Sequence, residues 1–121
     1  VNDFARVMPV TMFLGIVDLP LDQREQFVEW GVTFMTATDS KVKLGAQEKV
    51  VAYLQKVLDE RAANPGDDLL SRIAGWRKNS RFQGDYEVIG MAVLVFFGGL
   101  DTVANMLSFI TRYLAQNRHQ R

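Results

Sequence analysis

The apolar run at residues 88–110 constrains the fold most. It reads Val-Ile-Gly-Met-Ala-Val-Leu-Val-Phe-Phe-Gly-Gly-Leu-Asp-Thr-Val-Ala-Asn-Met-Leu-Ser-Phe-Ile. A helix formed from it is apolar on nearly every side, so other helices must enclose it. Only residues 88–100 precede the first charge, Asp101, whereas a membrane span needs about 18–20 uninterrupted apolar residues. The run therefore predicts the long central helix of an all-α domain.

Four residues in the middle of this helix suit a core helix poorly: Gly98, Gly99, Asp101 and Thr102. An interior glycine costs roughly 1 kcal/mol relative to alanine, and a buried carboxylate costs more unless it is paired. One interpretation is structural: the glycines let another helix approach, and Thr102 donates to the carbonyl of Gly98. The other is functional, because a charge within an apolar helix suggests a polar cavity or a proton path.

The composition narrows the class of protein. With 121 residues, 48% of them hydrophobic, the chain is long enough for one globular domain over residues 1–121. The 14 basic and 14 acidic side chains cancel, which disfavours nucleic acid or an anionic membrane as a partner. The chain has no cysteine, so it offers no disulfide and no thiolate ligand for iron. No signal peptide is visible, which predicts a cytoplasmic protein, and we expect the sequence to be a piece of a longer one.

Hydrophobic periodicity predicts five helices, at about residues 2–17, 22–37, 46–62, 67–75 and 86–116. Pro9 should kink the first helix or mark a join within it, because proline lacks a backbone donor. Polar residues 38–45 and the Asn64-Pro65-Gly66 sequence read as connections, and residues 78–84 as a loop or small hairpin.

Capping patterns predict where three of these helices begin. Asp22 and Glu25 have the spacing of a capping box at the start of the second helix. Asp67 or Asp68 can cap the fourth helix, and Asp85 the fifth.

Other candidate site residues favour structural interpretations. His119, the single histidine, lies among polar residues near the chain end and is expected to be solvated. Phe27, Trp30 and Phe34 recur at helical spacing, which is typical of a core and also of a helix that borders a pocket. No catalytic triad, metal-ligand cluster or phosphate-binding loop appears in the sequence.

Three segments carry a resemblance to a known family. The sequence Phe-Gly-Gly-Leu-Asp-Thr at residues 97–102 resembles the oxygen-binding helix of the cytochrome P-450 superfamily, whose pattern there is Ala/Gly-Gly-x-Asp/Glu-Thr. Residues 60–71 are similar to the junction between helices G and H of that family, and residues 13–20 to its E-to-F junction. The resemblance covers essentially the whole chain and looks closest to the bacterial soluble, camphor-hydroxylase-like branch. It implies a central fragment holding helices E to I.

The resemblance gives the unusual residues of the long helix a role. Gly98 and Gly99 would leave room for dioxygen and substrate beside a heme, which makes them the expected cofactor-binding residues. Asp101 and Thr102 would be the catalytic residues, with Thr102 hydrogen-bonded to bound dioxygen and Asp101 gating protons from solvent. Leu94 and Phe97 share their face and would contact a hydrophobic, terpenoid-like substrate. The second and third helices would form a mobile roof.

The sequence also departs from the family pattern. The family holds heme through a cysteine that this chain does not contain, and no Glu-x-x-Arg sequence occurs. The resemblance implies heme and a ferredoxin-type electron donor for the parent enzyme, but we expect this chain alone to bind no heme tightly and to be inactive. The alternative is a non-catalytic helical bundle or interaction module that forms a homo-oligomer through the exposed face of the central helix.

Overall fold

The computed structural model describes residues 2–78 and 84–120, apart from the side chains of residues 2, 3, 5, 6 and 101. Its α-helices are α1 (Asn2–Ile16), α2 (Arg24–Thr36), α3 (Ser40–Ala63), α4 (Leu69–Gly75) and α5 (Asp85–Gln116). Single 3₁₀ turns lie at Leu21–Gln23, Trp76–Lys78 and Arg118–Gln120. The described residues form no strand, and the predicted all-α architecture around a long central helix is confirmed.

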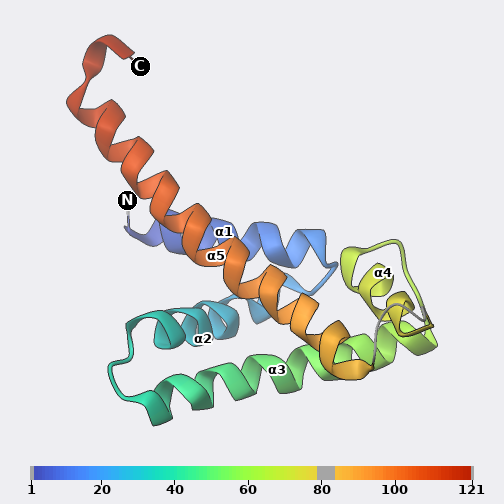
Figure 1. Ribbon diagram of the computed structural model, residues 1–121. Coiled ribbons are helices and arrows are strands. Elements are labelled where there is room, and N and C mark those ends of the chain that lie inside the picture. Colours follow the sequence, from blue (N-terminus) through green and yellow to red (C-terminus); the bar gives the residue numbers. More distant parts are fainter. Residues whose placement is uncertain (1, 79–83, 121) are drawn as a thin grey trace.

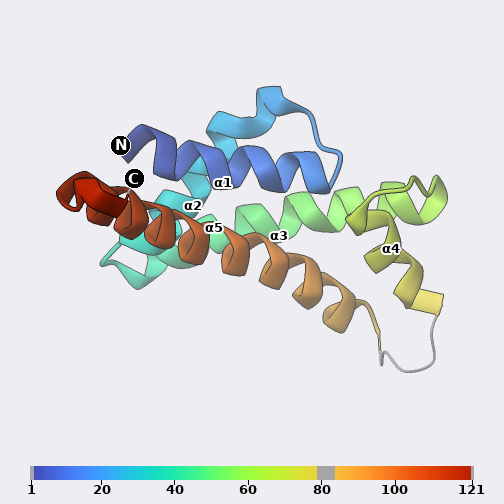
Figure 2. The ribbon, with the colours of Figure 1, turned by 90° about the horizontal axis from the view of Figure 1, so that it is seen from above.

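The helices form a body from which α5 extends. Helices α2 and α3 lie side by side as an antiparallel hairpin, and α4 packs on α3 at the end of the molecule away from the hairpin loop (Figures 1 and 2). Helix α5 crosses α1 and α3, and its C-terminal end extends past the N-terminus of α1 (Figure 1). The first half of α5 is therefore a core element, while its second half leaves the body.

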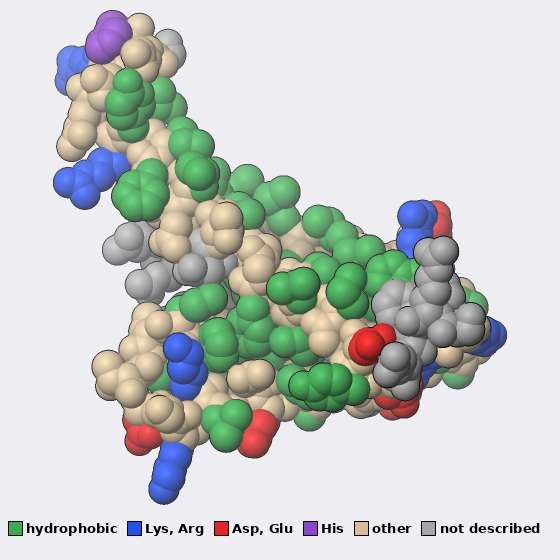
Figure 3. Space-filling model, in the orientation of Figure 1, with side chains coloured by type: hydrophobic (Ala, Val, Ile, Leu, Met, Phe, Trp, Pro, Cys, Tyr) green, Lys and Arg blue, Asp and Glu red, His purple; other side chains and the backbone are tan. Residues whose placement is uncertain are grey.

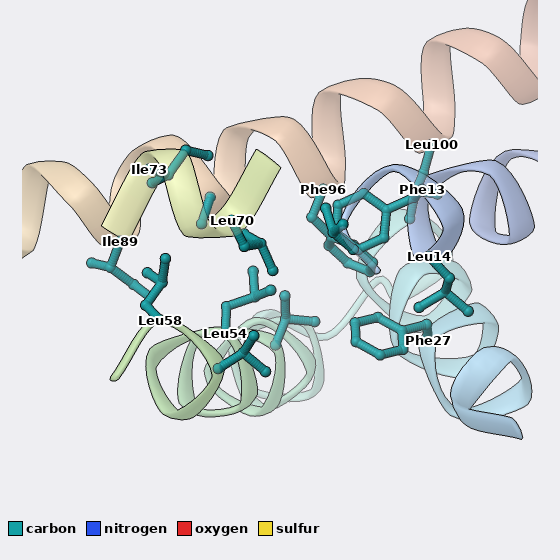
Figure 4. Packing of buried hydrophobic residues seen from close by; sticks show 14 of the residues in the cluster. Phe13, Leu14, Phe27, Leu54, Leu58, Leu70, Ile73, Ile89, Phe96 and Leu100 are labelled. Carbon is teal, nitrogen blue, oxygen red and sulfur yellow. The ribbon is translucent and has the colours of Figure 1, made fainter. Parts of the chain in front are cut away.

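An aromatic cluster joins three helices at the centre of the core. The Phe96 ring of α5 lies 5.1 Å from that of Phe13 in α1 and 5.3 Å from that of Phe27 in α2. Leucines and isoleucines of α3, α4 and α5 extend the same cluster toward α4 (Figure 4). Among the described residues, no member of the core cluster follows Leu100.

The helix starts differ from the sequence predictions in three places. Helix α3 begins at Ser40 rather than near residue 46, because Asp39 caps it by accepting a hydrogen bond from the Lys41 amide at 2.8 Å. The predicted Asp22 capping box is wrong, since the chain enters α2 through a 3₁₀ turn without a side-chain cap. Asp85 is the first residue of α5 and not its cap. The loop predicted at residues 78–84 lies mostly outside the described residues.

By length and composition alone, α5 is apolar enough to cross a membrane, and it is the one such helix in the described part of the chain. The sequence prediction differed because it ended the apolar run at Asp101. A core helix of a soluble protein meets the same criterion. The absence of a membrane partner therefore stays a prediction.

Candidate functional site

Helix α5 has one enclosed face and one open face over its first half. Ala92, Phe96 and Leu100, spaced four residues apart, are buried. Leu94, Gly98 and Thr102 follow the same spacing on the opposite side and are exposed, Leu94 to 63%. The predicted site residues on this second face therefore point away from the core of this chain.

The two glycines of the site border open space. A Cβ atom built on Gly98 or Gly99 would meet no other described residue within 4 Å. The structural interpretation, a close approach of another helix, is therefore not realised by any described helix of this chain. A close approach between helices occurs instead at Gly31 of α2, where an added Cβ would lie 3.3 Å from Leu100 Cδ1 of α5. Sequence reasoning missed it, since its only signal was a glycine within the apolar stripe of α2.

The Thr102 hydroxyl is exposed and makes no hydrogen bond to another described residue. Two hydroxyls further along α5 do bond back to the helix: Ser108 to the Ala104 carbonyl at 2.8 Å and Thr111 to the Leu107 carbonyl at 2.7 Å. The back-bond predicted for Thr102 by the structural interpretation is therefore absent from the described contacts. Asp101 is part of α5, but its side chain lies outside the described residues.

Phe97 joins the open face of α5 to the α2–α3 hairpin. Its half-buried ring lies 4.2 Å from that of Phe34, at the end of α2, and 4.9 Å from that of Phe96. The Lys43 ammonium lies 5.1 Å from the Phe34 centroid, a cation–π distance. The structure thus brings Phe34 to the predicted site. It also adds Lys43, which sequence reasoning assigned to a loop.

Apolar side chains gather on the surface along α5 and continue beyond the body of the molecule (Figure 3). Met106, Phe109 and Tyr113 are exposed to 56%, 69% and 50% in this second half of the helix. The molecule also has a groove of about 450 Å³ between α1 and α2, lined by Val7, Arg24, Glu25, Val28, Glu29, Val32 and Thr33. None of the predicted site residues lines it. The candidate site, as far as the structure describes it, is an exposed face of α5.

Among the side chains that the structure describes, Tyr53 and Asp68 have clearly shifted pKa values, and neither residue lies on α5. Burial raises the pKa of the Tyr53 hydroxyl, and the charges of Glu60 and Asp22 raise it further. Burial also raises the pKa of Asp68, but hydrogen bonds from Ser71 and the nearby Arg61 outweigh burial, and the pKa is lowered overall.

The residues present fit one side of a heme site. The open space beside Gly98 and Gly99 would accept a flat group against the helix backbone. A heme-thiolate site would also need a cysteine to hold the iron, and the chain has no cysteine. His119 is exposed at the far end of the molecule, beyond α5. This chain can therefore form one wall of such a site but does not supply its thiolate.

Comparison with known proteins identifies the family. The chain is 30% identical over 120 residues to the probable cytochrome P450 127A1 of Sinorhizobium fredii, a match that covers 98% of this chain and 29% of that protein. It is 25% identical over 121 residues to the polyketide biosynthesis cytochrome P450 PksS of Bacillus subtilis, a match that covers 98% of this chain and 30% of that protein. A steroid C26-monooxygenase of Mycobacterium tuberculosis is 26% identical over 127 residues, a match that covers 99% of this chain and 32% of that protein. The chain thus spans about three tenths of the length of these relatives.

Solved structures agree with the sequence matches. The ligand-free P450 monooxygenase TamI superposes with a TM-score of 0.78 at 26% identity, over 97% of this chain and 29% of that one. The putative thioether synthase SgvP, at 19% identity, shares the fold with a TM-score of 0.81 over 93% of this chain and 29% of its own. No protein-family model matches the chain. These relatives do not test the predicted camphor-hydroxylase-like branch, but they show that this chain belongs to the cytochrome P450 family and corresponds to a helical segment of its fold.

Proposed function

We propose that this chain forms the oxygen-side wall of the active site in a bacterial cytochrome P450 that inserts one oxygen atom from O2 into a hydrophobic substrate. The observation that carries this proposal is the open face of α5, where Leu94, Gly98 and Thr102 point away from the core. A helix so apolar is not expected to leave that face wet in its working state. A monooxygenase as a relative supports the reaction type.

Each residue of the open face has a proposed task. Gly98 and Gly99 leave space for the flat cofactor, because a side chain there would occupy the open volume beside the backbone. The Thr102 hydroxyl is available to hold and pass a proton, since no described group occupies it. Asp101 takes up protons from solvent. When heme is bound it supplies the activation of dioxygen, which protein side chains cannot perform.

Leu94 and Phe97 are proposed to contact the substrate. An apolar wall selects by shape and by burial of apolar surface rather than by paired charges. The name of the steroid C26-monooxygenase supports a hydrophobic substrate. We retain a terpenoid-like molecule as the substrate class, with a ferredoxin-type protein as the electron donor and the cytoplasm as the compartment.

A heme titration of the purified chain tests whether it is catalytically incomplete. After reduction and addition of carbon monoxide, we expect no thiolate-type Soret band, because the chain has no cysteine to supply the ligand. Any heme uptake should be weak and show a non-thiolate spectrum. A thiolate-type band would contradict the proposal that the ligand comes from outside this chain.

The role of Thr102 is tested in a longer cytochrome P450 chain that contains this segment and binds heme. Thr102→Ala should divert electrons from product to hydrogen peroxide and lower the product formed per electron several-fold. The reason is that the variant loses a hydroxyl positioned to deliver a proton in the reaction. Thr111→Ala is the matched control, since its hydroxyl is engaged with the Leu107 carbonyl. Equal coupling in the two variants would contradict the role of Thr102.

A second candidate function is self-association without redox chemistry. It is favoured by the exposed apolar residues Met106, Phe109 and Tyr113 on the extended half of α5. Sedimentation should show a homo-oligomer that Phe109→Glu converts to monomer, because a charge in an apolar interface is costly to desolvate. Tyr86→Glu serves as control, since Tyr86 is 88% exposed at the other end of the same helix. A folded wild-type monomer at all concentrations would exclude this candidate.

A further inference from the structure

Two chain reversals distant in sequence lie at the same end of the molecule. One is the junction between α1 and α2, and the other is the turn between α3 and α4 (Figure 1). The loop between α2 and α3 lies at the opposite end. The two reversals therefore form the base of the α2–α3 hairpin.

The first reversal depends on a residue in an unfavourable backbone conformation. Asp18 has a φ of 52°, in the left-handed region that favours glycine. The Leu19 amide donates to the Leu14 carbonyl at 2.9 Å, the long bond of a Schellman motif that ends α1. Since a residue other than glycine is strained there, other contacts must hold the junction.

The second reversal is a buried polar cluster. The Asp68 carboxylate accepts from the Ser71 amide at 3.0 Å and from the Ser71 hydroxyl at 2.6 Å. The Gly66 amide donates to the same hydroxyl at 2.9 Å. A Cβ on Gly66 would lie 3.0 Å from Asp68 Oδ2, so a larger residue there would crowd the Asp68 carboxylate.

Arg61, in the last turn of α3, contacts both reversals. Its Nη2 donates to the Asp18 backbone carbonyl at 2.8 Å, and its Nε lies 3.5 Å from Asp68 Oδ2. The Arg61 side chain is 24% exposed and that of Asp68 is 6% exposed, so solvent weakens this ion pair less than a surface pair. The Asp18 carboxylate, 3.9 Å away and 81% exposed, contributes little.

We propose that Arg61 is a strap that couples the α1–α2 junction to the α3–α4 turn, so that the base of the α2–α3 hairpin opens and closes as one unit. One guanidinium satisfies a backbone carbonyl of the first reversal and a buried carboxylate of the second. If either reversal opens, Arg61 loses one partner and the other reversal loses part of its support. Local opening is thereby shared between two reversals that are distant in sequence, since Arg61 and Asp18 alone are 43 residues apart.

Amide hydrogen exchange on the 121-residue chain tests the coupling. Arg61→Met keeps the length of the side chain but removes its donors, and it should accelerate exchange of the Leu19 and Gly66 amides about tenfold, a typical size for coupled neighbours. The Lys43 amide, at the far end of the hairpin, should not change relative to wild type. Arg72→Met is the matched control, because within the described part of the chain Arg72 pairs with the exposed Asp67, at 3.4 Å. Faster exchange at Gly66 with unchanged exchange at Leu19 would overturn the proposal.

A double-mutant cycle separates coupling from general destabilisation. Ser71→Ala should accelerate exchange at Leu19 about tenfold in the wild-type background and leave it unchanged in the Arg61→Met background, because Arg61 carries the connection. The same increase in both backgrounds would overturn the strap. If Arg61→Met does not fold, Arg61→Lys replaces it. One ammonium cannot reproduce the two-sided contact, so exchange should then rise at both reversals. A rise at one reversal alone, or wild-type protection at both, would count against the proposal.

Discussion

At the scale of single residues, the two chain reversals depend on the backbone conformation of one residue and on the buried side chain of another. These two residues are Asp18 and Asp68. Asp18 occupies a left-handed conformation at the end of α1. Asp68 is a buried carboxylate satisfied by Ser71 and Arg61. For each residue, a substitution is predicted to change the free energy of unfolding in a defined direction.

Asp18→Gly should stabilise the chain by roughly 0.5–1 kcal/mol, because glycine adopts a positive φ without the steric cost. The backbone carbonyl that accepts from Arg61 is retained in this variant. Urea denaturation measures the change, with Asp22→Gly as control in the neighbouring 3₁₀ turn, where glycine should lower stability. A lower free energy of unfolding for Asp18→Gly would contradict the strain at this position.

The pKa of Asp68 is lowered in the folded chain, so its carboxylate contributes stability above the unfolded-state pKa of about 3.9. That contribution is lost as the pH falls through the lower folded-state pKa. Asp68→Asn should therefore be less stable than wild type at pH 7, with the difference shrinking in strongly acidic solution. Denaturation between pH 7 and pH 2 measures this. Asp67→Asn is the control, because its side chain is 99% exposed, and it should change the free energy of unfolding at pH 7 less than Asp68→Asn does.

At the scale of elements, α5 combines two environments along one helix. Its first half buries Val88, Ala92 and Phe96 against the body, while the side that carries Gly98 and Thr102 stays open. The cost of two adjacent glycines in this helix is not offset by close packing with any described residue. Helix stability and the proposed cofactor space are therefore in conflict at these positions.

Gly98→Ala should stabilise this chain by up to about 1 kcal/mol, because it gains helix propensity and meets no neighbour within 4 Å. Gly31→Ala is the contrasting variant and should gain less or destabilise, since its Cβ would crowd Leu100. Thermal unfolding measures both. Destabilisation of the monomer by Gly98→Ala would contradict the open space beside this glycine.

At the scale of the whole molecule, the core ends before the chain does. Among the described residues, Leu100 is the last member of the core cluster, and α5 continues to Gln116 away from the body. An exposed helix end with few buried contacts has low local stability. The molecule thus contains a stable body and a less stable extension.

Limited digestion with trypsin should cleave first after Arg112 or Arg118, which are exposed on this extension. Lys49 and Lys56 are also exposed but lie on α3, which is anchored by the core, and should be cleaved later. Mass spectrometry of early products identifies the sites. Initial cleavage within α3 would contradict the assignment of the extension as the least stable element.

The sequence predicted the all-α class and the central helix because hydrophobic periodicity is encoded within a few turns. It also placed Leu94, Gly98 and Thr102 on one face, since their spacing fixes that in any helix. Their roles as site residues stay predictions. The predicted start of α3 was wrong, because the polar composition of residues 38–45 indicated a loop whereas Asp39 caps a helix that begins there.

The tertiary structure alone decided which contacts join distant segments. The Gly31–Leu100 approach, the Phe34–Phe97 ring pair and the Arg61 contact with Asp18 each join residues far apart in the chain. No local pattern specifies such pairs, because they arise only when the helices have packed and their side chains compete for the same space. Local sequence determined where helices form in this protein, and packing determined which face of α5 was left open.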